Sequence, residues 1–143
     1  MFQRILLAWD GSEASLRAFD VAIDVTRRYQ ASLQAVSIAY SPAHAETSAD
    51  RAESADAAHR YLLETFAQAR DRAERAGVDV EHEVIEGEPP ARTLLAHARE
   101  HGFDLIVCGH HHSRRSGRLL LRGVAEALVA DAATPVLVVT EDS

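Results

Sequence analysis

Residues 4–23, RILLAWDGSEASLRAFDVAI, contain the unit that decides the fold. RILLAW is a short apolar run, typical of a buried strand. The next three residues, DGS, indicate a turn, and Ser12 is a residue type that caps helix N-termini. Apolar residues then recur at the spacing of one helix face: Leu16, Phe19 and Ile23. The segment therefore predicts a strand that runs through a short turn into a helix.

The same alternation continues to the C-terminus. Further strands are predicted at residues 31–40, 78–87, 104–109 and 135–140. Helices are predicted at residues 50–76, from Pro89 and Pro90 to Gly102, and around the apolar stripe from Leu121 to Ala132. Strands that alternate with helical crossovers imply an α/β protein with a parallel sheet covered on both faces. Without an internal repeat or a linker, we expect residues 1–143 to form a single domain.

Composition excludes several classes of function. The 143 residues carry a formal net charge of −7, which argues against a general nucleic-acid or membrane-surface binder. Lysine is absent, so a Walker A loop and lysine Schiff-base chemistry are excluded. Cys108 is the only cysteine, so no intrachain disulfide can form. The N-terminal apolar run is too short for a signal peptide, and we expect a cytoplasmic protein with no membrane partner.

Ligands of such sheets bind at the carboxyl ends of the strands, where the strand order reverses. The loops after the first and fourth strands are therefore the candidate sites. The second of these loops is residues 109–123, GHHHSRRSGRLLLRG. It looks like a phosphate-binding loop that leads into a helix, but it carries three consecutive histidines and four arginines. Backbone N–H groups and arginine forks favour phosphate there, whereas the alternative is a charged surface loop whose arginines pair with carboxylates.

Other candidate residues support weaker interpretations. Adjacent side chains diverge, so His110, His111 and His112 do not complete a zinc site, and no metal is predicted. Asp10 could contact a ligand or only start the turn, and a lone aspartate is not a catalytic constellation. We expect no enzyme, although a slow ATPase remains open. Trp9 either lines a cleft or belongs to the core. Cys108 is expected to be an inert buried thiol, and the scattered histidines are expected at the surface: His44, His59, His82, His97 and His101.

Four segments resemble the universal stress protein family: ILLAWDGSEAS, EGEPP, DLIVCGHH and LLLRGVAEALVADAATPVLVV. The resemblance extends over essentially the whole chain. It implies a doubly wound, five-stranded parallel sheet of strand order 3-2-1-4-5, with helices on both faces. It also implies a homodimer that pairs through the last strand. Residues 135–140, PVLVVT, agree with this, because an apolar edge strand is usually covered or paired.

Many members of that family bind ATP through a pattern of Gly-x-x-Gly, nine residues, then Gly-Ser or Gly-Thr. Placed on this chain, the pattern falls on Gly109, His112, Arg122 and Gly123, so one glycine is retained and the hydroxyl is lost. Asp10 matches the family residue beside the adenosine, and Ile38 matches the apolar residue beside the adenine. The resemblance thus implies these binding residues: Trp9, Asp10, Gly11, Ser12, Ile38, Gly109, His111, His112, Arg122, Gly123 and Val124.

Two functions follow as alternatives. The first is a stress-response regulatory dimer with a degenerate site for ATP or AMP, at the carboxyl ends of strands one and four. The second is a family member that binds no nucleotide and acts only through contacts with unidentified protein partners. If nucleotide binds, we expect Arg122 to contact its phosphates.

Overall fold

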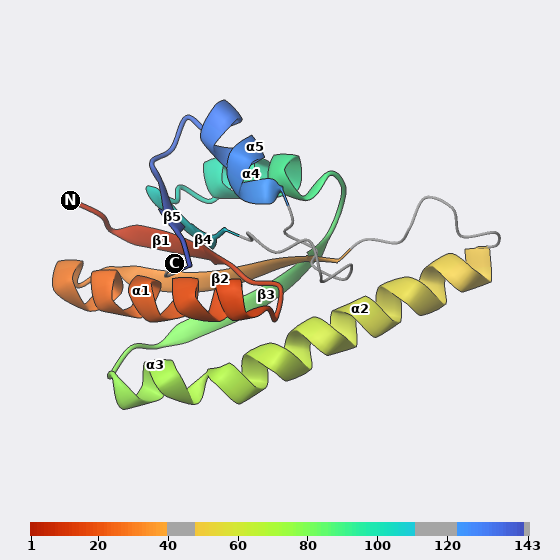
Figure 1. Ribbon diagram of the computed structural model, residues 1–143, viewed down its shortest axis with the longest axis horizontal. Coiled ribbons are helices and arrows are strands. Elements are labelled where there is room, and N and C mark those ends of the chain that lie inside the picture. The colour runs from red at the N-terminus through yellow and green to blue at the C-terminus, as the bar shows by residue number, and fades with distance from the viewer. Residues whose placement is uncertain (40–47, 111–122, 142–143) are drawn as a thin grey trace.

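The computed structural model describes residues 1–39, 48–110 and 123–141. Its centre is a five-stranded parallel sheet of order β3-β2-β1-β4-β5, as the sequence predicted (Figure 1). The strands are β1 (Arg4–Ala8), β2 (Ser32–Ala39), β3 (Val80–Glu86), β4 (Leu105–Gly109) and β5 (Val136–Val139). The order reverses between β1 and β4, so the loops after these two strands meet at the same edge.

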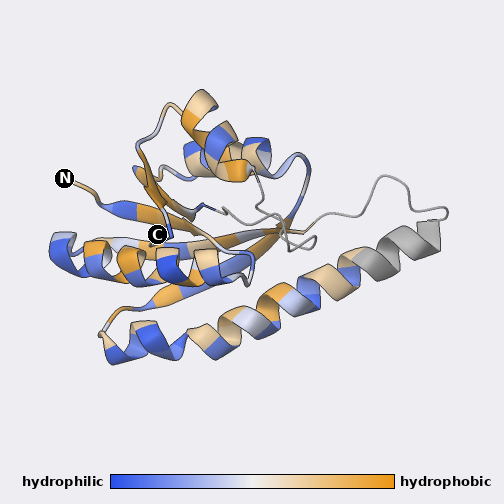
Figure 2. Cartoon of the chain, in the orientation of Figure 1, coloured by the Kyte–Doolittle hydropathy of each residue, from blue (hydrophilic) through white to orange (hydrophobic). Residues whose placement is uncertain are grey.

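Helices cover both faces of the sheet, as Figure 1 shows. One face carries α1 (Glu13–Tyr29), α2 (Ser48–Ala69) and α3 (Asp71–Arg75). The other carries α4 (Pro90–Glu100) and α5 (Val124–Asp131). Hydrophilic and apolar residues alternate along α1 (Figure 2), and the buried ones recur at helical spacing, as at Ala18, Phe19, Ala22 and Ile23. The prediction of a doubly wound α/β protein is confirmed.

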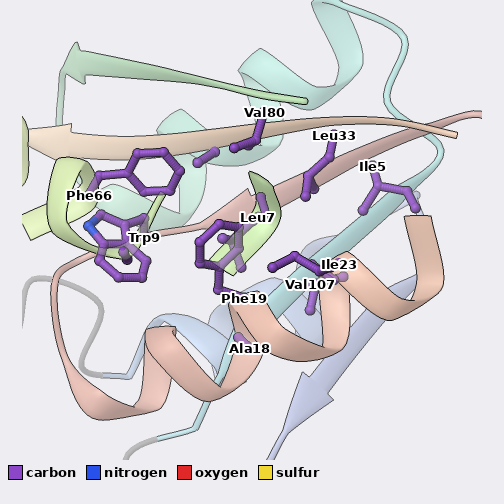
Figure 3. Close-up of a cluster of buried hydrophobic side chains, with 14 of the residues drawn as sticks. Ile5, Leu7, Trp9, Ala18, Phe19, Ile23, Leu33, Phe66, Val80 and Val107 are labelled. Carbon is purple, nitrogen blue, oxygen red and sulfur yellow. The ribbon is translucent and has the colours of Figure 1, made fainter. Parts of the chain in front are cut away.

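The core consists of two clusters separated by the sheet. Strand residues alternate between them: Ile5 and Leu7 belong to the α1–α2 side, Leu6 and Ala8 to the α4–α5 side. The first cluster contains the buried aromatic side chains of Trp9, Phe19 and Phe66, which pack together at the end of β1 (Figure 3). The second cluster contains one aromatic residue, Phe103, and otherwise mainly aliphatic residues such as Val36, Ile38, Leu94, Ile106, Val124 and Leu128.

The helix predicted at residues 50–76 is divided at Arg70. There the Arg70 carbonyl accepts from the Ala73 amide at 3.1 Å, an i→i+3 bond, as well as from the Glu74 amide at 3.3 Å, the usual i→i+4 bond. The Arg70 guanidinium donates to the Val80 carbonyl at 2.6 Å, which ties this turn to β3. The end predicted at Gly77 is confirmed, because that residue has φ +74° in a Schellman-type arrangement.

Candidate functional site

A buried aspartate opens the loop after β1. Asp10 is 2 % exposed, and its Oδ1 accepts a hydrogen bond from the Ser12 amide at 2.9 Å and another from the Ser12 hydroxyl. Ser12 in turn caps α1, because its Oγ accepts from the Ser15 amide at 3.1 Å. Asp10 therefore starts the turn, and the predicted N-cap at Ser12 is confirmed. The turn holds a carboxylate at the carboxyl end of β1.

Gly11 allows α2 to pack directly on this turn. Its φ is +81°, a conformation that favours glycine. A Cβ at this position would lie 2.9 Å from Thr65 Oγ1 and 3.1 Å from the Tyr61 ring. The predicted site residue Gly11 thus has a packing role, and it connects the loop after β1 to α2.

Trp9 belongs to the core. Of its two interpretations from sequence, a cleft wall or a core residue, the structure supports the second. The side chain is 2 % exposed and packs edge-on against Phe19 and Phe66, as Figure 3 shows. Its indole Nε1 donates to Thr65 Oγ1 at 3.2 Å. The indole points to the α1–α2 side of the sheet, whereas Ile38 is buried on the α4–α5 side. The two residues therefore do not form one pocket wall.

Gly109, the one motif glycine in register, ends β4 against the start of α1. A Cβ there would lie 2.4 Å from the Ala14 carbonyl oxygen and 2.9 Å from the Ala14 Cβ. No ordinary side chain fits this contact, so the fold itself requires glycine at this position. Its presence is accounted for by packing, whether or not a phosphate binds beside it.

The other side of the site is the beginning of α5. Gly123 is the N-cap residue with φ +75°, and a Cβ added to it would meet open space. Val124 follows as a buried residue of the α4–α5 cluster. The predicted site residues His111, His112 and Arg122 lie outside the described part of the chain, together with Arg114, Arg115 and Arg118.

His110 links the end of β4 to its neighbours. Its amide donates to the Val139 carbonyl at 3.0 Å, and its Nε2 lies 2.6 Å from Glu126 Oε1 on α5. The imidazole is therefore engaged with a carboxylate at the start of α5. Within residues 1–39, 48–110 and 123–141, no group of three His, Cys, Asp or Glu side chains could hold a metal ion.

Cys108 is buried at 1 % exposure, as expected from its strand. Burial, followed by the negative charge of Glu126, raises the pKa of this thiol to about 11. The thiolate form is therefore scarce near neutral pH. This agrees with an inert thiol.

Two histidines expected at the surface are not there. His82 is partly buried beneath α2, where its ring stacks on Phe66 at a centroid distance of 4.4 Å. Burial, then the charges of Arg70 and His59, lowers its pKa to about 4. His97 is 6 % exposed and lies 3.2 Å from Gln34 Oε1, and burial is the first cause that lowers its pKa, ahead of His101.

The sequence contained a signal for both histidines. His82 lies two residues after Val80 and two before Val84 in β3. Residues two apart in a strand share a face, so His82 faces inward with these two valines. His97 lies three residues after Leu94 and one before Ala98, within the apolar stripe of α4. The surface prediction was wrong because residue type was given more weight than periodicity.

Ser37 was also missed. It is fully buried in β2, and its hydroxyl donates to the Trp9 carbonyl at 2.7 Å. The same oxygen lies 2.8 Å from His82 Nε2. A polar chain thus connects β3 through β2 to the residue that directly precedes Asp10.

The order of the strands, the buried aspartate after β1 and the glycine at the start of α5 define a doubly wound α/β protein with a candidate ligand site at its switch point. The model of the universal stress protein family matches residues 1–140, and the chain belongs to that family.

Individual relatives agree with this assignment. A putative universal stress protein of Staphylococcus haemolyticus is 34 % identical over 139 residues, which cover 96 % of this chain and 84 % of the relative. The solved structure of a universal stress protein from Lactobacillus plantarum is 25 % identical, with a TM-score of 0.82 and coverage of 96 % and 97 %. A universal stress protein solved in complex with cAMP is 29 % identical, with a TM-score of 0.73 and the same coverage.

No helix among the residues that the structure describes is both long and apolar enough to cross a membrane.

Proposed function

We propose that this chain is a regulatory universal stress protein that binds an adenine nucleotide at the carboxyl ends of β1 and β4. The observation that carries the proposal is the convergence of two loops at the switch point. Pairing of Leu7 with Val107 aligns the ends of β1 and β4, so the turn at Asp10 and the exit at His110 lie at one edge. A relative 29 % identical to this chain was solved with cAMP.

The two loops suit different parts of such a ligand. The Asp10 carboxylate is an acceptor for ribose hydroxyls. The N-terminus of α5 at Gly123 offers backbone N–H groups and a favourable dipole to phosphate. Arg122 precedes it in the sequence, and we assign to its guanidinium the bidentate contact with the phosphates.

The proposed role is sensing rather than catalysis. The Asp10 carboxylate already accepts two hydrogen bonds from Ser12, and the Cys108 thiol is buried with a raised pKa. Neither is poised as a base or a nucleophile. The protein would act in the cytoplasm by presenting its liganded or empty state to a protein partner.

The proposed assembly is a homodimer that pairs through β5. This strand lies at the edge of the sheet beside β4, and its four residues are all only partly buried. Leu137 and Val139 pack toward the α1 side, Val136 and Val138 toward the α4–α5 side. Such an apolar edge is stabilised when the same strand of a second copy pairs with it across a two-fold axis.

A second candidate function is action through protein contacts alone, with the nucleotide site closed. The contact between Gly109 and Ala14 favours it, because packing accounts for the retained glycine without a ligand. His112 and Arg122 in place of the motif glycines, and Gly123 in place of the hydroxyl residue, favour it too.

The two candidate functions can be distinguished by measuring whether nucleotide co-purifies with the protein. Protein purified at low salt is heat-denatured, and the released nucleotide is identified by chromatography and mass spectrometry. We expect an adenine nucleotide in wild type, less in Arg122→Ala, and wild-type amounts in the control Arg92→Ala on α4. Protein that carries no nucleotide in all three preparations and binds none when it is added would support the second function. More nucleotide in Arg122→Ala than in wild type would mean that Arg122 fills the phosphate space.

A further inference from the structure

The polar chain beneath the turn at Asp10 lies in an otherwise aromatic part of the core. Ser37 and His82 face the α1–α2 side of the sheet, where Trp9, Phe19 and Phe66 pack together. A hydroxyl and an imidazole in these surroundings are stabilised only if their hydrogen bonds are made. Both contacts of the Ser37 oxygen are short, 2.7 Å to the Trp9 carbonyl oxygen and 2.8 Å to His82 Nε2.

Counting protons assigns the direction of both bonds. A serine hydroxyl has one proton to donate and lone pairs to accept with. The Trp9 carbonyl oxygen can only accept, so the Ser37 proton lies in that bond. The contact between Ser37 and His82 must then be donated by the histidine, which requires a hydrogen on Nε2. Because burial lowers the pKa of His82 to about 4, the ring is neutral near pH 7 and Nδ1 carries no hydrogen. The hydrogen bonds are therefore donated from His82 to Ser37 and from Ser37 to the Trp9 carbonyl.

Packing fixes the position of the His82 imidazole, which is the first donor in this series of hydrogen bonds. The His82 ring stacks on Phe66 at 4.4 Å, and the Arg70 guanidinium lies over the same Phe66 ring at 5.2 Å from its centroid. Arg70 also donates to the Val80 carbonyl, two residues before His82 in β3. The imidazole therefore has a defined position relative to both α2 and the sheet.

The acceptor at the other end is where β1 leaves the sheet. The paired register of β1 with β2 ends at Ala8 and Val36, and the Trp9 amide still donates to the Val36 carbonyl at 3.0 Å. The Ser37 hydroxyl then holds the Trp9 carbonyl. The orientation of that peptide group sets the direction in which the backbone continues to Asp10.

We propose that His82 is a positioning residue of the candidate site: through Ser37 it holds the Trp9 carbonyl and thereby the turn that presents Asp10. Its effect on ligand affinity rests on the proposed nucleotide function, whereas its effect on the turn does not. His82 makes no contact with the ligand itself, and α2 contributes to the site through the ring of Phe66 that holds the imidazole.

The test compares wild type with three single variants and with the double variant that combines His82→Phe and Ser37→Ala. His82→Phe keeps a ring against Phe66 but removes the donor, His82→Gln keeps an N–H donor, and Ser37→Ala removes the link. Calorimetric titrations with ATP, AMP and cAMP measure affinity. We expect His82→Phe and Ser37→Ala each to weaken binding about three- to tenfold, the scale of one hydrogen bond. The double variant should be no weaker than either single variant, because both break one chain. His82→Gln should recover most of the affinity.

Nuclear magnetic resonance separates a failure of this proposal from a failure of the proposed function. In wild type, the ¹⁵N shifts of His82 should identify hydrogen on Nε2. The amide resonances of residues 9–11 should move in Ser37→Ala and His82→Phe and stay close to wild type in His82→Gln. If wild type binds none of the three nucleotides, the nucleotide function fails and these resonances alone decide the proposal.

Three results would overturn it: hydrogen on Nδ1 of His82, unchanged amide resonances of residues 9–11 in both disruptive variants, or unchanged affinity in variants that fold. If His82→Phe does not fold, Ser37→Ala and His82→Gln still test the positioning role of His82, because each of these substitutions changes few atoms.

Discussion

At the scale of single residues, glycine and histidine have roles here that differ from those their motifs suggest. Gly109 is the one glycine of the nucleotide-binding pattern that this chain keeps. Yet the space beside its Cα, where a side chain would begin, is filled by the backbone of Ala14. His82 looked like one of several surface histidines, yet it lies beneath α2 against Phe66. In both cases packing decides the role of the residue.

Gly109→Ala should destabilise the protein strongly. The added Cβ would lie 2.4 Å from the Ala14 carbonyl oxygen, a backbone atom that cannot move without α1. We expect a loss of about 3 kcal/mol in the free energy of unfolding, measured by urea denaturation. Gly102→Ala is the matched control, since its Cβ meets open space and only the φ of +71° opposes it, at about 1 kcal/mol. Equal losses in the two variants would contradict the packing role of Gly109.

His82 predicts a dependence of stability on pH. Its pKa is about 4 in the folded state and 6.5 in the unfolded state, so the unfolded chain binds the proton more readily. The stability it contributes is complete above pH 6.5 and is lost as the pH falls toward 4, about 1 to 3 kcal/mol in all. Urea denaturation from pH 4 to 8 should therefore show a smaller pH effect in His82→Phe than in wild type. His97, whose pKa is also lowered, accounts for part of the remaining slope. Identical slopes in the two proteins would contradict the assignment.

At the scale of elements, periodicity predicted most of what the structure contains. Each of the strands in the described part of the chain was found from its apolar pattern, and the N-cap Ser12 and the terminal Gly77 were found from residue type. The end of α1 could not be predicted in this way, because Gln30 adopts φ 54° without being a glycine or an asparagine. The break at Arg70 was equally hidden, since the side-chain contact found there joins Arg70 to Val80 on β3, ten residues further along the sequence.

For the candidate site, the sequence predicted where some of the residues lie in the fold, but not what surrounds them. Asp10, Gly109 and Gly123 lie at the predicted edge of the sheet. Ser37 and His82 were missed because their importance comes from contacts between β2, β3 and α2, which are distant in the sequence. The sequence left open whether Trp9 lines a cleft or belongs to the core, because its contact with Phe66 on α2 could not be predicted.

The cap of α1 should be measurable on its own. Ser12→Ala removes the acceptor of the Ser15 amide, which lies 3.1 Å from the hydroxyl oxygen, and the partner of Asp10 as well. We expect a loss of about 1 to 2 kcal/mol in urea denaturation. Ser32→Ala, which removes an exposed hydroxyl bonded to the Gln3 carbonyl at 3.3 Å, should lose less than half of that. A Ser12→Ala variant as stable as wild type would show that the cap is not needed.

At the scale of the whole molecule, the edge of the sheet is the feature that predicts assembly. The carbonyls of Pro135 and Val139 accept from β4, at 3.0 Å each, so alternation directs the N–H groups of Val136 and Val138 away from β4. These are the groups that a second copy would bond to. Pairing through them would extend the five strands into one continuous sheet across a dimer.

Val138→Pro should therefore give a monomer, because it removes an outward N–H while leaving the bonds to β4. Val138→Ala keeps that N–H and should remain dimeric, as should Val129→Ala, a change at a residue of α5 that is 61 % exposed. Size-exclusion chromatography with light scattering measures the mass. A wild-type protein of 15.6 kDa in solution, or a dimeric Val138→Pro, would contradict pairing through β5.

The decisive measurement for the nucleotide site is isothermal titration calorimetry of ATP, AMP and cAMP with nucleotide-stripped wild-type protein, at two salt concentrations. We predict saturable binding of at least one of them, weaker at high salt because the arginines and the start of α5 recognise the phosphate. No heat and no thermal shift at millimolar concentrations of all three would contradict a nucleotide site and leave protein contacts as the function.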